Sequence, residues 1–156
     1  MRKMGIDQSL TSSGIVILEN DNVIFYTTIK TKKTDGDLFK RCLIISNEIN
    51  DIIKEHKVDY IAIEGLPFNM RSNVTRDLAG LQAVIITNIY KDFLKQTKII
   101  SPTALKKAAT GSGKTKKEDM VEALPLDFKS SIFSSGYKKS TGLYDLADAY
   151  FLAKSL

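Results

Sequence analysis

The period of the apolar pattern changes near residue 38, and this change restricts the chain to a mixed α/β fold. Before it, three segments rich in β-branched and apolar residues, 3–7, 14–18 and 23–29, are joined by short turns and predict an antiparallel meander of strands. After it, apolar residues recur every three or four positions between Leu38 and His56, which predicts an amphipathic helix.

The rest of the chain alternates between strand and helix patterns. The expected elements are a buried strand over 58–64, a helix over 74–94, a strand over 98–100, a helix opened by Ser101 and ended by Gly111, a helix over 117–124, a loop over 130–142 and a last helix over 143–154. This order predicts one mixed five-stranded sheet with helices on its faces. With 156 residues, 43% of them apolar, we expect one domain over 1–156.

Three features limit the location and chemistry of the protein. No apolar run approaches the roughly 18–20 residues that span a bilayer, and the first residues lack a signal-peptide pattern, so we expect a cytoplasmic protein. Cys42 is the only cysteine and His56 the only histidine, which leaves too few ligands for an internal disulfide or a zinc site. Any bound metal should therefore be held by oxygen atoms.

The positive charge of the chain is concentrated in one stretch. The net charge is +5, but residues 91–117 carry eight lysines and one acid, Asp92, so the remainder is slightly acidic. Lysines that neutralise phosphates release counterions, so this patch favours a phosphate-rich partner. A solvated lysine-rich surface is the alternative.

Four carboxylates stand in apolar surroundings on three of the predicted elements. Asp7 ends the first strand, Glu64 ends the buried strand, and Asp145 and Asp148 share one face of an otherwise apolar last helix. Each could be a turn residue, a helix cap or the edge of a surface helix, but convergence on a divalent ion explains all four. All-oxygen ligation favours Mg²⁺ or Mn²⁺, and two such ions beside a lysine patch indicate phosphodiester hydrolysis of nucleic acid.

In order and spacing, Gly5-Ile6-Asp7, Ile61-Ala62-Ile63-Glu64 and Asp145-Leu146-Ala147-Asp148-Ala149 resemble the Holliday-junction resolvases of the RuvC type, over essentially the whole chain. The resemblance implies an RNase H-like fold and two Mg²⁺ ions, with Mn²⁺ able to substitute, bound by Asp7, Glu64, Asp145 and Asp148. It also implies a water activated for in-line attack and a homodimer acting on branched DNA, above all four-way junctions. No membrane partner and no nucleotide cofactor are expected.

The resemblance further implies residues that contact DNA. The lysines expected to hold the DNA backbone are Lys106, Lys107, Lys114, Lys116 and Lys117. Phe68 lies one position further from Glu64 than the family's aromatic residue that stacks at the junction centre. The helix that follows, with Gln82, resembles the family's dimer helix. Gln8 and Ser9 replace a common Pro-Gly, which is compatible with a phage-encoded member of altered sequence preference.

Several alternatives stay open. Gly111–Thr115 ends like a P-loop, but Ala108 stands where that motif needs its first glycine. Gly5-Ile6-Asp7 followed by Thr11–Gly14 also resembles the first phosphate loop of actin-like ATPases and sugar kinases, which use a related fold twice. A nuclease acting on forks or flaps, and a branched-nucleic-acid binding module without cleavage, are the remaining candidates. The intact set of acids argues against the last of these.

Overall fold

Five strands form one mixed sheet in the order β3-β2-β1-β4-β5. In the computed structural model, which describes residues 1–66 and 73–156, the antiparallel meander consists of β1 (Arg2–Asp7), β2 (Ser13–Glu19) and β3 (Asn22–Ile29). The two strands parallel to β1 are β4 (Tyr60–Glu64) and β5 (Thr97–Ile100). The predicted fold class, a mixed five-stranded sheet flanked by helices, is confirmed, although β4 begins two residues later than the pattern predicts.

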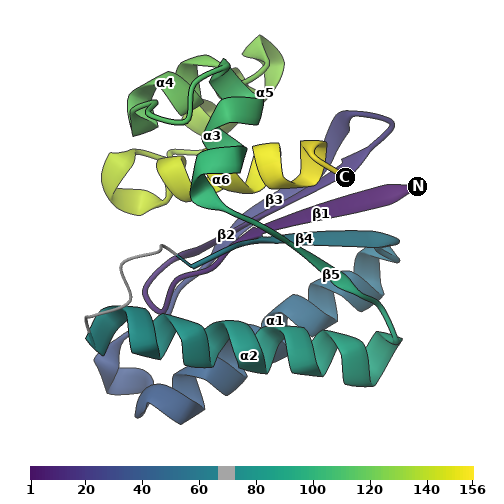
Figure 1. The fold of residues 1–156 in the computed structure, drawn as a ribbon, viewed down its shortest axis with the longest axis vertical. Helices are drawn as coiled ribbons and strands as arrows, with labels where there is room; N and C mark the ends of the chain where they lie inside the picture. Colours follow the sequence, from purple (N-terminus) through teal and green to yellow (C-terminus); the bar gives the residue numbers. More distant parts are fainter. Residues whose placement is uncertain (67–72) are drawn as a thin grey trace.

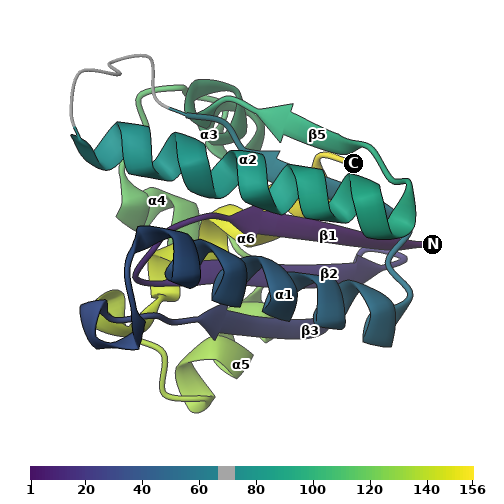
Figure 2. The ribbon, with the colours of Figure 1, turned by 90° about the horizontal axis from the view of Figure 1, so that it is seen from below.

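Helices cover both faces of the sheet (Figures 1 and 2). One face carries α1 (Leu38–His56) and α2 (Asn73–Phe93). The other carries α6 (Leu143–Lys154), with α3 (Pro102–Thr110), α4 (Lys117–Glu122) and α5 (Leu126–Ser134) beyond it. Two short 3-10 helices, η1 (Lys33–Asp35) and η2 (Lys139–Thr141), precede α1 and α6. Among the described residues, no helix has the length and apolar content needed to cross a membrane.

Alternate residues of β1 face the two helical layers. Met4 and Ile6 are fully buried in the core that includes residues of α1 and α2, whereas Gly5 faces α6. Asp7 follows Gly5 by two residues, so the alternation of the strand directs its side chain to the α6 face as well.

Two glycines allow α6 to lie directly on the sheet. A Cβ atom on Gly5 would stand 1.9 Å from the carbonyl oxygen of Ala149, and one on Gly14 would stand 2.3 Å from that of Asp145. Both distances are far below any atomic contact, so these positions of β1 and β2 require glycine. The close approach sets the height of α6 above β1 and brings its first turns to the end of that strand.

The region around α5 differs from the sequence prediction. Residues 130–142 are rich in serine and glycine and predict a loop, but α5 continues to Ser134, so the prediction is wrong over 130–134. Serine is a weak helix former, and tertiary packing decides here, since Phe128 and Ile132 bury one face of the helix in the core.

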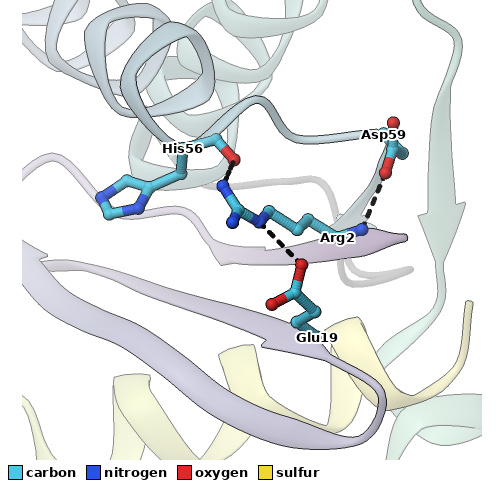
Figure 3. Close-up of polar contacts among 4 residues, drawn as sticks. All are labelled: Arg2, Glu19, His56 and Asp59. Carbon is cyan, nitrogen blue, oxygen red and sulfur yellow. Dashed lines mark hydrogen bonds and ion pairs between the residues drawn. The ribbon is translucent and has the colours of Figure 1, made fainter.

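Charged groups at the amino end of β1 are paired with one another (Figure 3). Nε of Arg2 donates to Oε1 of Glu19 at 3.1 Å, and Nη1 donates to the carbonyl oxygen of His56 at 2.7 Å. The backbone N–H of Arg2 donates to Oδ2 of Asp59 at 2.8 Å. These contacts join β1 to β2, to the end of α1 and to the residue before β4.

Candidate active site

Asp7 and Glu64 lie side by side at the carboxyl ends of β1 and β4, opposite the end of the sheet that carries Arg2. Ile6 in β1 pairs with Ile63 in β4, so the residues that follow them end two neighbouring parallel strands. In open α/β sheets this carboxyl end is where ligands bind. Both side chains are half-buried, and their carboxyl groups are hydrogen-bonded to each other.

The first turns of α6 bring two further carboxylates to this end. In Figure 1, α6 starts beside the carboxyl ends of β1 and β4 and runs back along the sheet. Asp145 and Asp148 are half-buried, and Oγ of Ser12 donates to Oδ2 of Asp145 at 2.6 Å. The fold therefore brings together all four acids that the sequence singles out.

The carboxylates are close enough for their charges to raise the pKa values of Asp7 and Asp148. Burial, and then the charges of Glu64, Asp148 and Asp145, raise the pKa of Asp7 well above its ordinary value. Burial also raises the pKa of Glu64. Burial, with the charges of Glu64 and Asp145, raises the pKa of Asp148 to about 7. Because burial and repulsion both oppose the charged form, a cation at this place would be strongly favoured.

The donor chemistry of this cluster suits a hard divalent cation, since carboxylates supply only oxygen ligands. In the part of the chain that the structure describes, however, no three acidic, histidine or cysteine side chains are arranged to hold an ion as they stand. The carboxyl group of Asp7 is hydrogen-bonded to that of Glu64, whereas Ser12 engages only Oδ2 of Asp145. A bound cation would take the place of the hydrogen bond between Asp7 and Glu64, and the hydroxyl of Ser12 could stay on Asp145.

The basic stretch borders the carboxylate cluster. Lys106 on α3 and Lys117 on α4 lie close enough to Glu64 and Asp148 to lower the pKa values of both. The other three lysines singled out by the sequence are exposed. Lys107 lies in the last turn of α3, Lys114 in the loop that follows, and Lys116 at the N-cap of α4. Phe68, the expected stacking residue, lies outside the described residues.

The two phosphate-loop alternatives lack the necessary context. Gly111–Thr115 follows α3, whereas a P-loop follows a strand. In the segment Thr11–Gly14, Ser12 donates to Asp145, and Ser13 donates to the carbonyl oxygen of Ser9 at 2.7 Å. These hydroxyl groups are therefore engaged by the protein and do not face a phosphate site.

Three polar side chains that the sequence analysis did not assign to the site position the acids. One is Ser12, described above. The side-chain amides of Gln8 and Gln82 both donate to the backbone carbonyl of Glu64, at 3.1 and 2.8 Å, and so fix the end of β4. Gln82 lies four residues after Leu78 and three before Ile85, both members of the apolar stripe of α2. A glutamine on an inward stripe is the signal that could have identified it.

Comparisons with known proteins agree with this architecture. The family model described as "Crossover junction endodeoxyribonuclease RuvC" matches residues 3–131. A relative of that name from Prochlorococcus marinus subsp. pastoris is 31% identical over 128 residues, or 80% of each chain. Another, from Janthinobacterium sp. (strain Marseille), is 32% identical over 132 residues, which cover 80% of this chain and 71% of the relative. The solved structure "T. thermophilus RuvC in complex with Holliday junction substrate" has a TM-score of 0.76 at 17% identity, covering 98% of this chain and 90% of that one.

The strand order, the two helical layers and this structural similarity define an RNase H-like fold. The chain belongs to the RuvC family of crossover junction endodeoxyribonucleases, which are metal-dependent nucleases. The family model ends at residue 131, before Asp145 and Asp148, whereas the structural similarity covers nearly the whole chain. The last helix is thus matched through the structure.

Proposed function

We propose that this chain resolves four-way DNA junctions by cutting two strands through metal-dependent phosphodiester hydrolysis. The observation that carries the proposal is the convergence of four carboxylates, from β1, β4 and α6, at one end of the sheet in a RuvC-family chain. The Thermus relative that holds a Holliday junction supports the same substrate here. Residues 1–156 would act as one nuclease domain, in the cytoplasm of a bacterial or phage-infected cell.

The proposed catalytic residues and metal ligands are Asp7, Glu64, Asp145 and Asp148, which would hold two Mg²⁺ ions, with Mn²⁺ able to substitute. Bound ions of this kind lower the pKa of a water molecule and stabilise charge on the attacking and leaving oxygens. The chain itself positions these carboxylates. Strand pairing fixes Asp7 beside Glu64, the hydroxyl of Ser12 holds Asp145, and partial burial limits competition by bulk water.

The proposed DNA contacts come from the basic stretch. Lys106 and Lys117 lie beside the carboxylates, where a scissile phosphate would lie, and the three exposed lysines extend the contact along the backbone. Each neutralised phosphate releases counterions, so junction binding should weaken as salt rises. Two symmetric nicks about a branch point require two sites related by a two-fold axis, and we therefore propose a homodimer.

A comparison of substrates tests this function. A synthetic four-way junction, a fork and a plain duplex with the same arm sequences are incubated with the chain, with and without Mg²⁺. We expect paired symmetric nicks on the junction and only with Mg²⁺. Equal nicking of the fork would replace junction resolution with a broader nuclease for branched DNA. Binding without cleavage, in Mg²⁺ and in Mn²⁺, would reduce the chain to a binding module.

A further inference from the structure

Tyr144 lies directly before Asp145, in the first turn of α6, at the centre of a charged cluster. Its hydroxyl donates to Oε1 of Glu118 at 2.7 Å, and Nζ of Lys139 lies 3.1 Å from the same oxygen. The ammonium groups of Lys117 and Lys139 lie over its ring, at 5.6 and 5.8 Å from the centroid. One side chain on α6 therefore contacts both the first turn of α4 and η2.

Lys117 stands at the end of α6 that carries the carboxylates, because the ring beneath its ammonium group belongs to the residue directly before Asp145. Its charge also lowers the pKa values of Glu64 and Asp148. A lysine side chain is flexible, and this one is exposed. The face of an aromatic ring attracts an ammonium group and so restricts where it lies. The ring of Tyr144 thus provides the contact that keeps Lys117 on the side of the carboxylates.

Glu118 follows Lys117 in the chain and could otherwise attract its ammonium group away from the site. Instead, the carboxylate of Glu118 is occupied by the hydroxyl of Tyr144 and by Lys139. The hydrogen bond from Tyr144, with the contributions of backbone and Lys139, lowers the pKa of Glu118 to about 2, so this carboxyl is charged near neutral pH.

Tyr150, in the same helix as Tyr144, has the surroundings of a residue that packs in the core. Tyr150 is 4% exposed and lies against the rings of Phe128 and Phe151. Tyr144 is half-buried and has lysine ammonium groups over its ring. Its surroundings are those of a residue that orients charge.

We propose that Tyr144 is a positioning residue for Lys117. Its ring holds the Lys117 ammonium beside Glu64 and Asp148, where the ammonium meets the phosphate to be cut, and its hydroxyl fixes α4 to α6 through Glu118. This inference rests on the proposed junction cleavage. In this proposal Tyr144 acts through Lys117 and through the helix that carries it, and needs no contact of its own with the DNA.

A double-mutant cycle tests the inference. Single-turnover nicking of a four-way junction is compared among the wild type, Tyr144→Leu, Lys117→Met and the double variant. Because misplacement of a reacting-site group by about 1 Å can cost as much as 100-fold in rate, we expect Tyr144→Leu to lose roughly tenfold. Lys117→Met should lose at least as much, and the double variant no more than Lys117→Met. Losses that multiply would overturn the inference.

Two further measurements separate positioning from a structural role. Tyr144→Phe keeps the ring and should restore most of the rate lost in Tyr144→Leu. Junction binding without divalent ions should weaken in Lys117→Met, with a salt slope lower by about one, and adding Tyr144→Leu should change neither value. A further fall in affinity or slope would show that Tyr144 acts independently of Lys117.

Tyr26→Phe is the matched control, since the hydroxyl of Tyr26 is hydrogen-bonded to Ser131 on α5 and to Ser135, which follows that helix. It should nick at the wild-type rate. If Tyr144→Leu does not fold, Tyr144→Met takes its place in the cycle. A wild-type chain that does not nick junctions would contradict the proposed function, whereas a nicking chain with multiplicative losses would contradict only the role of Tyr144.

Discussion

In the described part of the chain, charged side chains are paired at the amino end of β1 and unpaired at its carboxyl end. At the amino end, Arg2 is paired with Glu19, and its backbone N–H bonds to Asp59 (Figure 3). At the carboxyl end, four carboxylates meet, and in residues 1–66 and 73–156 no lysine or arginine forms an ion pair with any of them. The first arrangement is complete within the fold. The second has only the more distant charges of Lys106 and Lys117 to offset it, so it favours an added cation, which is why we place the chemistry there.

The largest effect should come from Asp7→Asn. The substitution keeps the size of the side chain but removes a carboxylate whose pKa burial and three neighbouring charges raise. Metal-supplied charge stabilisation is worth several kcal/mol, so we expect cleavage to fall by about 1,000-fold or more. Junction binding, measured by gel shift, should stay close to the wild-type value. Asp59→Asn, at the other end of the sheet, is the control and should cut normally. A variant at position 7 that still nicks would remove Asp7 from the metal site.

The second effect is on stability and depends on pH. The pKa of Asp148 is about 7 in the folded chain, against an ordinary 3.8, so without divalent ions this carboxyl destabilises the fold above pH 7. The penalty should shrink as pH falls from about 7 and should be absent near pH 4. Because interacting carboxyls titrate as a group, one substitution gains less than the full shift of a single residue. We therefore expect Asp148→Asn to raise the free energy of unfolding by about 2 kcal/mol at pH 8.

Urea unfolding in the presence of a chelator, at about pH 8 and about pH 4, measures this difference. Glu19→Gln at the amino end should not stabilise the chain at either pH, because Glu19 has a partner in Arg2. An Asp148→Asn chain that is less stable than the wild type at the higher pH would contradict the account of uncompensated charge.

A smaller effect should follow Ser12→Ala. The hydroxyl of Ser12 lies 2.6 Å from Oδ2 of Asp145, and a hydrogen bond to a charged group is worth about 1.5–3 kcal/mol. Only part of the free energy of this hydrogen bond affects the rate of cleavage, so we expect single-turnover nicking to slow by about tenfold. Ser131→Ala removes a serine bonded to Tyr26 and serves as control. Equal rates in Ser12→Ala and the wild type would mean that Asp145 is held without Ser12.

The smallest effect belongs to the amino end. Glu19→Met removes the ion pair with Arg2 and leaves the other bonds of Arg2 in place; the two side chains are 38% and 34% exposed. Exposed pairs of this kind contribute about 0.2–1 kcal/mol, so the free energy of unfolding should fall by no more than about 1 kcal/mol. Junction nicking should not change. A marked loss of cleavage would show that the two ends of β1 are not independent.

The acids were predictable because each interrupts a regular pattern. Asp7 and Glu64 end strands whose apolar periods are clear, and Asp145 and Asp148 interrupt an apolar helix, so residue type and position were enough to select them. Gly5 and Gly14 show what the pattern cannot supply. Their role depends on the approach of α6 from more than a hundred residues away, which is visible only in the folded chain.

The supporting residues were less predictable because their partners are distant in the chain. Ser12 bonds to a residue 133 positions away, and Gln82 bonds to a backbone carbonyl rather than to a side chain. The serine-rich helix α5 was missed because the burial of Phe128 and Ile132 outweighs the weak helix propensity of its serines. Local pattern identified the charges, whereas tertiary contact determines what holds them.

Calorimetric titration of the chain with Mg²⁺ and Mn²⁺, at concentrations that support cleavage and near pH 7, tests the central claim most directly. Because the carboxyl cluster is partly protonated there, binding should release protons, seen as a heat that varies with the ionisation enthalpy of the buffer. Asp7→Asn should abolish both the binding and the proton release. Equal binding by the wild type and Asp7→Asn, or binding by the wild type without proton release, would contradict a metal site built from these four carboxylates.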